Sequence, residues 1–244
     1  MANRQLFSLD GRLALCAELV RDNAKIADIG TDHAYLPVWL AKKGRISHAI
    51  AADLRPEPLK SGNGNIKKYG VSDLVETRLS DGLHEIQPDE ADDIIIAGMG
   101  GELTAKIINE ATWLKNPEKR LILQPMTKSE TLIKYLCENG FEIITERAAK
   151  SGGKVYSVMQ CGYTGKAVPF DDVYLHVGKM PYDNSAEADE YINGKIKMLK
   201  CKADGLSMAG KTDTAAEIYA LADRINKLCE SRHNRERGNE REDT

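Results

Sequence analysis

Short apolar runs alternate with amphipathic segments along most of this chain, and that alternation constrains its fold more than any other feature. Each apolar run is short, ends at a turn residue and is followed by a segment of mainly helical periodicity. The run Ile94–Ile96 has no polar alternation, which is typical of a strand buried on both faces of a parallel sheet. Strands are predicted at residues 24–30, 48–53, 74–80, 92–98 and 120–125. The chain is therefore predicted to be an α/β protein.

Helices are predicted between these strands. Ser8 is expected to cap the first helix, and Gly70 and Gly140 follow two others, where glycine commonly ends a helix. The predicted ranges are 8–20, 56–69, 102–113 and 128–139. The alternation also implies a helix between the first two strands and another between the third and the fourth.

Two further strand-like runs, 141–150 and 154–163, flank a Ser-Gly-Gly turn and are predicted to form an antiparallel hairpin. Parallel strands joined by helices form a doubly wound sheet with right-handed crossovers. A parallel sheet that ends in an antiparallel pair is the Rossmann-like layout of the class I methyltransferases. We predict such a domain for residues 1–165, followed by a connector at 166–183.

The chain changes character after about Pro181, where strand signals cease. Two apolar stripes recur there at steps of three and four residues, which is typical of coiled-coil helices. The stripes are Ile192, Ile196, Leu199, Ala203 and Leu206, and then Ile218, Leu221, Ile225 and Leu228. We predict a helical coiled-coil hairpin at 184–232 and a charged, flexible tail at 233–244.

Basic residues on this hairpin suggest an arm that binds nucleic acid. Lys195 and Lys200 are the main candidates on its first helix. Other basic residues nearby are Lys197, Lys202, Arg232, His233, Arg235 and Arg237. Acidic residues are interleaved throughout, so a solvated surface on a dimerising coiled coil explains the same charges equally well.

Composition narrows the class of protein. The formal net charge of −3 does not indicate nucleic-acid binding by itself. Five scattered cysteines without a CxxC pair predict neither a disulfide framework nor a metal site. The N-terminus lacks the apolar segment of a signal peptide, and no apolar run approaches the roughly 20 residues that span a bilayer. We therefore expect a cytoplasmic protein without a metal or membrane contact.

Polar and glycine residues stand at four predicted strand ends, and such ends meet at one edge of a parallel sheet. Asp28 and Gly30 end the first strand, and glycine lets backbone approach a ligand closely. Asp53, followed by Leu54, ends the second, where an acid typically binds ribose hydroxyls. The other ends carry Ser80, Asp81 and Gly82, and then Gly98, Met99, Gly100 and Gly101. Together these residues predict a cofactor site, with Asp81 on an adenine amino group.

The loop Gly30-Thr31-Asp32-His33-Ala34-Tyr35 decides which cofactor this site suits. A dinucleotide loop has the pattern G-x-G-x-x-G, so that a pyrophosphate can lie on a helix N-terminus. Here the second and third glycines are missing, and Asp32 would repel a pyrophosphate. S-adenosylmethionine carries a sulfonium and an ammonium, which Asp28 and Asp32 would attract. The loop therefore favours this methyl donor.

The motifs ADIGTDHAYLP, AADLRPEPL, SDGL, GMGGEL and LQP, in this order, resemble the bacterial TrmK family of tRNA adenine-N1 methyltransferases. The resemblance extends to about Tyr163 and continues more loosely through the helical hairpin. It implies a Rossmann-like methyltransferase domain with a coiled-coil arm, S-adenosylmethionine as donor, and adenine 22 in the D-loop region of tRNA as target.

Several residues near these motifs are candidates for contact with the reacting groups. Asp32, His33 and Met99 are the catalytic candidates, although Asp32 could instead cap the next helix and His33 could form only local hydrogen bonds. Tyr35 could stack on a base or simply pack. The remaining substrate candidates are Arg12 and Arg55 for phosphate, and Gln124, which could also belong to a plain turn.

Three alternatives remain at this point: an NAD(P)-dependent oxidoreductase on the same fold, a non-catalytic RNA-binding module, and a methyltransferase for a small molecule. The loop composition disfavours the first, and the set of strand-end acids disfavours the second. The hairpin disfavours the third, since a small substrate needs no long arm. The oligomeric state does not follow from these patterns, and a monomer is favoured.

Overall fold

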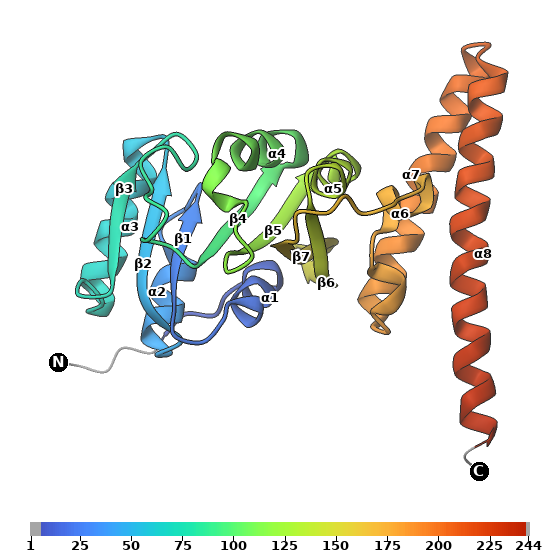
Figure 1. Ribbon diagram of the computed structural model, residues 1–244. Helices are drawn as coiled ribbons and strands as arrows, with labels where there is room; N and C mark the ends of the chain where they lie inside the picture. Colours follow the sequence, from blue (N-terminus) through green and yellow to red (C-terminus); the bar gives the residue numbers. More distant parts are fainter. Residues whose placement is uncertain (1–5, 243–244) are drawn as a thin grey trace.

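A computed structural model describes the backbone of residues 6–242 and the side chains of residues 6–230. A single seven-stranded sheet organises the first domain of the chain, with the strand order β3-β2-β1-β4-β5-β7-β6 (Figure 1). The strands are β1 (Ala24–Ile29), β2 (Ile46–Asp53), β3 (Val75–Leu79), β4 (Asp93–Gly100), β5 (Arg120–Thr127), β6 (Phe141–Ser151) and β7 (Lys154–Tyr163). The first five are mutually parallel, and β7 is antiparallel to both of its neighbours. The predicted Rossmann-like sheet with an antiparallel final pair is confirmed.

Helices cover both faces of this sheet. The helices are α1 (Gly11–Leu19), α2 (Tyr35–Lys42), α3 (Pro56–Tyr69), α4 (Gly101–Glu110) and α5 (Ser129–Glu138). Along β4, Ile94 and Ile96 join the core beneath α4 and α5, whereas Ile95 joins the core beneath α1, α2 and α3. Both faces of β4 are thus buried, as its uninterrupted apolar run predicts.

Two details of the predicted elements are wrong. The first helix begins at Gly11, and its cap is Asp10 rather than Ser8, because the Asp10 carboxylate accepts the Leu13 N–H at 3.0 Å. No helix joins β3 to β4. Residues 80–92 form successive turns instead, with Gly82 at φ +56° and the Ser80 hydroxyl bonded within the turn.

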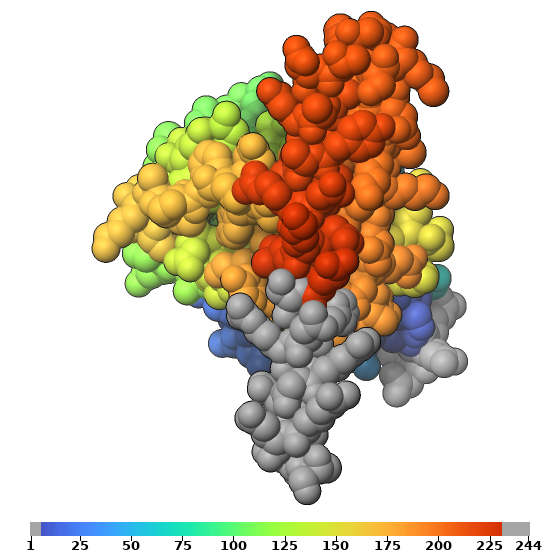
Figure 2. Space-filling view, turned by 90° about the vertical axis from the view of Figure 1, so that its right-hand side faces the viewer, coloured from blue at the N-terminus to red at the C-terminus, as the bar shows by residue number. Residues whose placement is uncertain are grey.

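The chain beyond the sheet forms the predicted helical hairpin, called the arm below (residues 186–242). It consists of α7 (Ala186–Met208) and α8 (Thr212–Glu242), and α6 (Asp172–Val177) precedes it in the connector. The two arm helices lie side by side next to the β6 edge of the sheet, and the end of the hairpin where they join rises above the level of the sheet (Figures 1 and 2). Their apolar contacts include Ile192, Ile196, Leu199 and Ile225. The side chains of the predicted tail, Arg232 to Arg237 included, lie outside the described residues.

In the part of the chain that the structure describes, no helix has the length and apolar content to cross a bilayer. The same residues contain no group of three or more His, Cys, Asp or Glu side chains placed to hold a metal ion.

Candidate functional site

The loops after β1, β2 and β3 are tied together at one edge of the sheet. The N–H groups of Gly30 and Thr31 donate to the Ala52 carbonyl at 2.8 and 2.9 Å, and the Ser80 N–H donates to the Asp53 carbonyl at 3.0 Å. Since β1 lies between β2 and β4, this edge is the topological switch point, where ligands bind in sheets of this type. The structure therefore brings the predicted cofactor residues together.

Two glycines with unusual torsions lie at this edge of the sheet. Gly30 and Gly98 adopt left-handed torsions, with φ of +74° and +85°. A Cβ at Gly30 would overlap the terminal methyl group of Met99, so the residue after β1 and the end of β4 are in direct contact. Gly98 is also where the pairing of β4 with β5 shifts register. Both positions favour glycine because of their positive φ, and at Gly30 the nearby Met99 side chain also leaves no room for a Cβ.

Asp28 lies near the end of β1, two residues before Gly30. The pKa of its carboxyl group is raised to about 6, mainly by burial and to a smaller extent by the charge of Asp53, while the nearby Thr31 hydroxyl opposes the rise. Thr31 Oγ1 is itself buried and is the one buried side-chain polar atom, among the described residues, without a hydrogen bond of ordinary geometry. An unsatisfied hydroxyl beside a buried carboxylate is typical of a ligand site rather than of a finished core.

Asp53 is buried at the end of β2, and its neighbours face outward. Its carboxylate accepts the Arg55 N–H at 2.8 Å, and the exposed Arg55 guanidinium lies 3.6 Å from the same oxygen. Leu54 is 63% exposed, which is unusual for a large apolar side chain at the end of a buried strand. The pair offers a hydrogen-bond acceptor beside an apolar surface.

The turn after β3 has an internal role for Ser80. Its hydroxyl donates to the Gly82 carbonyl at 2.9 Å and accepts the Glu85 N–H at 3.2 Å. Gly82 packs on Ile107 of α4, and Asp81 is exposed. Ser80 thus holds the turn, which leaves Asp81 as the side chain able to meet a ligand.

The loop before α2 is strained. His33 and Ala34 both have positive φ, at 59° and 53°, a conformation that is uncommon outside glycine and clusters at functional sites. Asp32 is 81% exposed in its side chain and lies 3.2 Å from His33 Nε2. Ala34, without a side-chain cap, is the residue that starts α2, so the alternative role of Asp32 as a helix cap is wrong. The rings of His33 and Tyr35 are 5.4 Å apart.

A buried contact that the sequence did not predict links α1, β4 and β5. The side-chain oxygen of Gln124 accepts from Arg12 Nη1 at 2.6 Å and from the Gly98 N–H at 3.2 Å. Gln124 is fully buried, and Arg12 also pairs with Asp10 at 3.0 Å. This placement argues against direct contact of Gln124 with substrate. It makes Gln124 a support for the turn at Gly98, and no motif near either residue signals the pairing.

The two arm lysines differ in position. Lys195 points into the interface with the first domain, where its ammonium donates to Ser129 Oγ at 2.7 Å. This placement argues against the predicted RNA contact of Lys195, because its charge is used within the protein. Lys200 stays on the outer part of the hairpin, half-exposed and 3.8 Å from Asp223 of α8.

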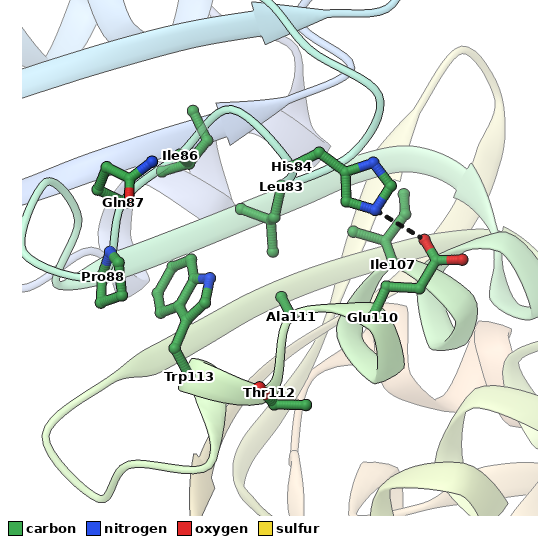
Figure 3. A pocket seen from close by; sticks show the side chains of 10 residues that line it. All are labelled: Leu83, His84, Ile86, Gln87, Pro88, Ile107, Glu110, Ala111, Thr112 and Trp113. Atoms are coloured by element: carbon green, nitrogen blue, oxygen red, sulfur yellow. Dashed lines mark ion pairs between the residues drawn. The ribbon is translucent and has the colours of Figure 1, made fainter.

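A separate cavity of about 320 Å³ lies between the turn after β3 and α4 (Figure 3). Leu83, Ile86 and Trp113 form much of its wall, and His84 and Glu110 face one another across it at 3.6 Å. None of the predicted site residues lines it.

Comparison with known proteins assigns the family. Residues 9–159 match the methyltransferase domain family. The tRNA (adenine(22)-N(1))-methyltransferase of Bacillus subtilis (strain 168) is 34% identical over 228 residues, which cover 91% of this chain and 96% of that protein. The chain belongs to the TrmK family.

Solved structures of TrmK proteins extend the match to the arm. The crystal structure of the B. subtilis M1A22 tRNA methyltransferase TrmK has a TM-score of 0.78 at 29% identity, and it covers 93% of this chain and 99% of that one. The Streptococcus pneumoniae protein Sp1610, solved in complex with S-adenosyl-L-methionine, has a TM-score of 0.77 at 27% identity, with coverage of 89% and 99%. Membership of the TrmK family removes the oxidoreductase interpretation.

Proposed function

We propose that this protein transfers a methyl group from S-adenosylmethionine to N1 of adenine 22 in tRNA. The observation that carries the proposal is the match to the B. subtilis enzyme over nine-tenths of the chain, including the arm. A small-molecule substrate or a purely structural RNA-binding role would not require both the strand-end site and the arm.

The strand-end residues suit this donor. S-adenosylmethionine supplies, when bound, a methyl group on a positively charged sulfur. Asp28 is proposed to attract the ammonium and sulfonium charges, and a cation beside it would offset the cost of burial that raises the pKa of its carboxyl group to about 6. Asp53 is proposed to accept from ribose hydroxyls, with Leu54 against the adenine ring and Asp81 on its amino group. The buried Thr31 hydroxyl and the glycines at 30, 98 and 100 leave backbone and polar groups open to a ligand.

The chemistry at the target base requires little proton transfer. N1 of adenine has a lone pair in the ring plane and becomes cationic on methylation, so alignment and electrostatic stabilisation are the main tasks. The exposed carboxylate of Asp32 is proposed to accept from the exocyclic amine and to favour the positive product. His33 and Tyr35, beside it, are proposed to contact the base after it has left its stack. Met99 would pack at the reacting end, and Arg12 and Arg55 near the phosphates.

The proposal is tested with unmodified tRNA and methyl-labelled donor, followed by nucleoside analysis and mapping of the modified position. We expect N1-methyladenosine at position 22 and no product from a matched tRNA with guanosine at that position. Label in another nucleoside, or in the guanosine-22 tRNA, would contradict the substrate assignment. Since tRNA is the substrate, we further propose action in the cytoplasm, and a monomer that sedimentation should detect at about 27 kDa.

A further inference from the structure

A buried polar cluster joins the arm to the catalytic domain. Ser129, Glu146 and Ser157 of the domain are each almost fully buried, and Tyr191 and Lys195 of α7 pack onto them. Lys195 Nζ donates to Ser129 Oγ at 2.7 Å and lies 5.4 Å from the centre of the Tyr191 ring. Ser157 Oγ donates to Glu146 Oε1 at 2.5 Å. Buried polar groups that satisfy one another fix a single arrangement of the elements that carry them.

The connector reinforces the same junction. The Lys179 N–H donates to Glu146 Oε2 at 2.7 Å, and Asp183 accepts the Ala148 N–H at 2.9 Å. Gly178 has φ +50°, and a Cβ there would overlap the Glu146 carboxylate. Burial raises the pKa of Glu146 and lowers that of Lys195, while the attraction between the two charges opposes both shifts. The connector therefore runs clamped along the edge strand β6.

Ser129 is also linked, through the residues that precede it, to the glycine-rich end of β4. It follows Lys128, which has φ +55°, and the Lys128 carbonyl lies so near Gly101 that a Cβ on Gly101 would overlap it. Thr127 pairs with Gly100 in the sheet. Direct contacts thus run from Lys195 to Ser129, then to Lys128, and then to the glycine turn at residues 98–101.

We propose that Lys195 is a positioning residue for methyl transfer: through Ser129 it fixes the angle of the arm relative to the glycine turn, so that tRNA held by the arm presents one adenine to the site. This inference rests on the proposed function. It assigns Lys195 the role of orienting the arm, and leaves contact with RNA to exposed lysines such as Lys197 and Lys202.

The kinetic test compares Lys195→Met and Ser129→Ala with Met198→Ala, which shortens an exposed side chain on the same helix. We expect unchanged donor affinity in all three. The single-turnover rate at saturating tRNA should fall about 10- to 100-fold in the first two, as is typical of a misplaced substrate, and stay unchanged in Met198→Ala. The double variant Lys195→Met/Ser129→Ala should be no slower than the slower single variant, because both remove one interaction. Ser129→Thr, which keeps the hydroxyl, should retain most of the rate.

A second measurement needs no substrate, so it separates this inference from the proposed function. Exposed Cys201 on α7 and a cysteine introduced by Lys106→Cys on α4 carry spin labels in a Cys229→Ala background. We expect a narrow distance distribution in the parent and in Met198→Ala, and a broad one in Lys195→Met and in Ser129→Ala. The inference is overturned if both variants keep the parental distribution, or if both keep the parental rate at saturating tRNA. If the parent protein has a narrow distance distribution but does not methylate tRNA, the proposed function is overturned instead.

Discussion

The turns at the carboxyl ends of the strands and the lysines of the arm had equally visible sequence signals, yet only the first signals placed their residues well. Glycine is required at position 98 because of its own backbone torsion, and Asp53 is placed by the strand that it ends. In both cases the sequence segment that indicates the residue also contains the structural feature on which it depends. The direction of Lys195 depends on Ser129, which is 66 residues away in sequence. Residues with local requirements are therefore legible from sequence, whereas the role of a helix surface depends on what packs against it.

Gly101 lies as close to neighbouring backbone as any described glycine, and Gly101→Ala should have a larger effect on folding than the variants that follow. The new Cβ would overlap the backbone carbonyl of Lys128, and backbone cannot move aside as a flexible side chain can. We expect a loss of about 2–3 kcal/mol in the free energy of unfolding, typical of overpacking, measured by urea denaturation. Gly64→Ala in α3 is the control, since a Cβ there meets nothing within 4 Å. Equal stability of the two variants would show that the close approach at Gly101 carries no cost.

The same contrast explains which parts of the molecule were predicted. The alternation of strands and helices, the antiparallel final pair and the gathering of the strand-end residues at one edge of the sheet follow from strand periodicity and from turn residues. The bond from Arg12 to Gln124 joins residues 112 apart, and the cluster around Glu146 joins the domain to the arm. No pattern within a few residues records such pairs. The prediction of a helix between β3 and β4 was wrong, because Gly82 and the hydrogen bonds of the Ser80 hydroxyl fold the chain into turns there.

Asp53→Ala tests whether the strand-end acids bind the donor as proposed. Loss of hydrogen bonds to a charged acceptor costs about 1–3 kcal/mol. The free energy of donor binding, measured by calorimetry, should therefore weaken by that amount. Arg55→Ala is the matched control, because it removes the exposed partner of Asp53 and should alter donor affinity only a few-fold. Unchanged donor affinity in Asp53→Ala would remove Asp53 from the cofactor site.

Asp28 predicts a pH dependence of donor binding. Its pKa is about 6 in the free protein, and a bound cation favours the ionised carboxylate and so lowers that pKa. Donor affinity should therefore rise about tenfold from pH 5 to pH 7. The effect on folding has the opposite sign: since the folded pKa lies above the ordinary value, stability should fall as pH rises from about 4 to 6 and then level off.

Asp28→Asn separates this group from others that titrate nearby. The variant should bind the donor with a nearly flat pH profile and should lose the decline in stability between pH 4 and pH 6. If the slope of donor affinity survives in Asp28→Asn, the titrating group is another residue, and the proposed role of Asp28 is wrong.

The smallest effect should come from Gly205 in the arm, where nothing in the structure requires glycine. Gly205 lies inside α7, and a Cβ there meets nothing within 4 Å. Gly205→Ala should raise the free energy of unfolding by about 0.5–1 kcal/mol, because alanine loses less conformational entropy in a helix. Gly210→Ala is the matched control five residues on: φ there is +76°, so that variant should be destabilised. If Gly205→Ala lowers stability as well, this part of the arm is constrained by a contact that its open surroundings do not reveal, and the contrast with the strand-end turns weakens.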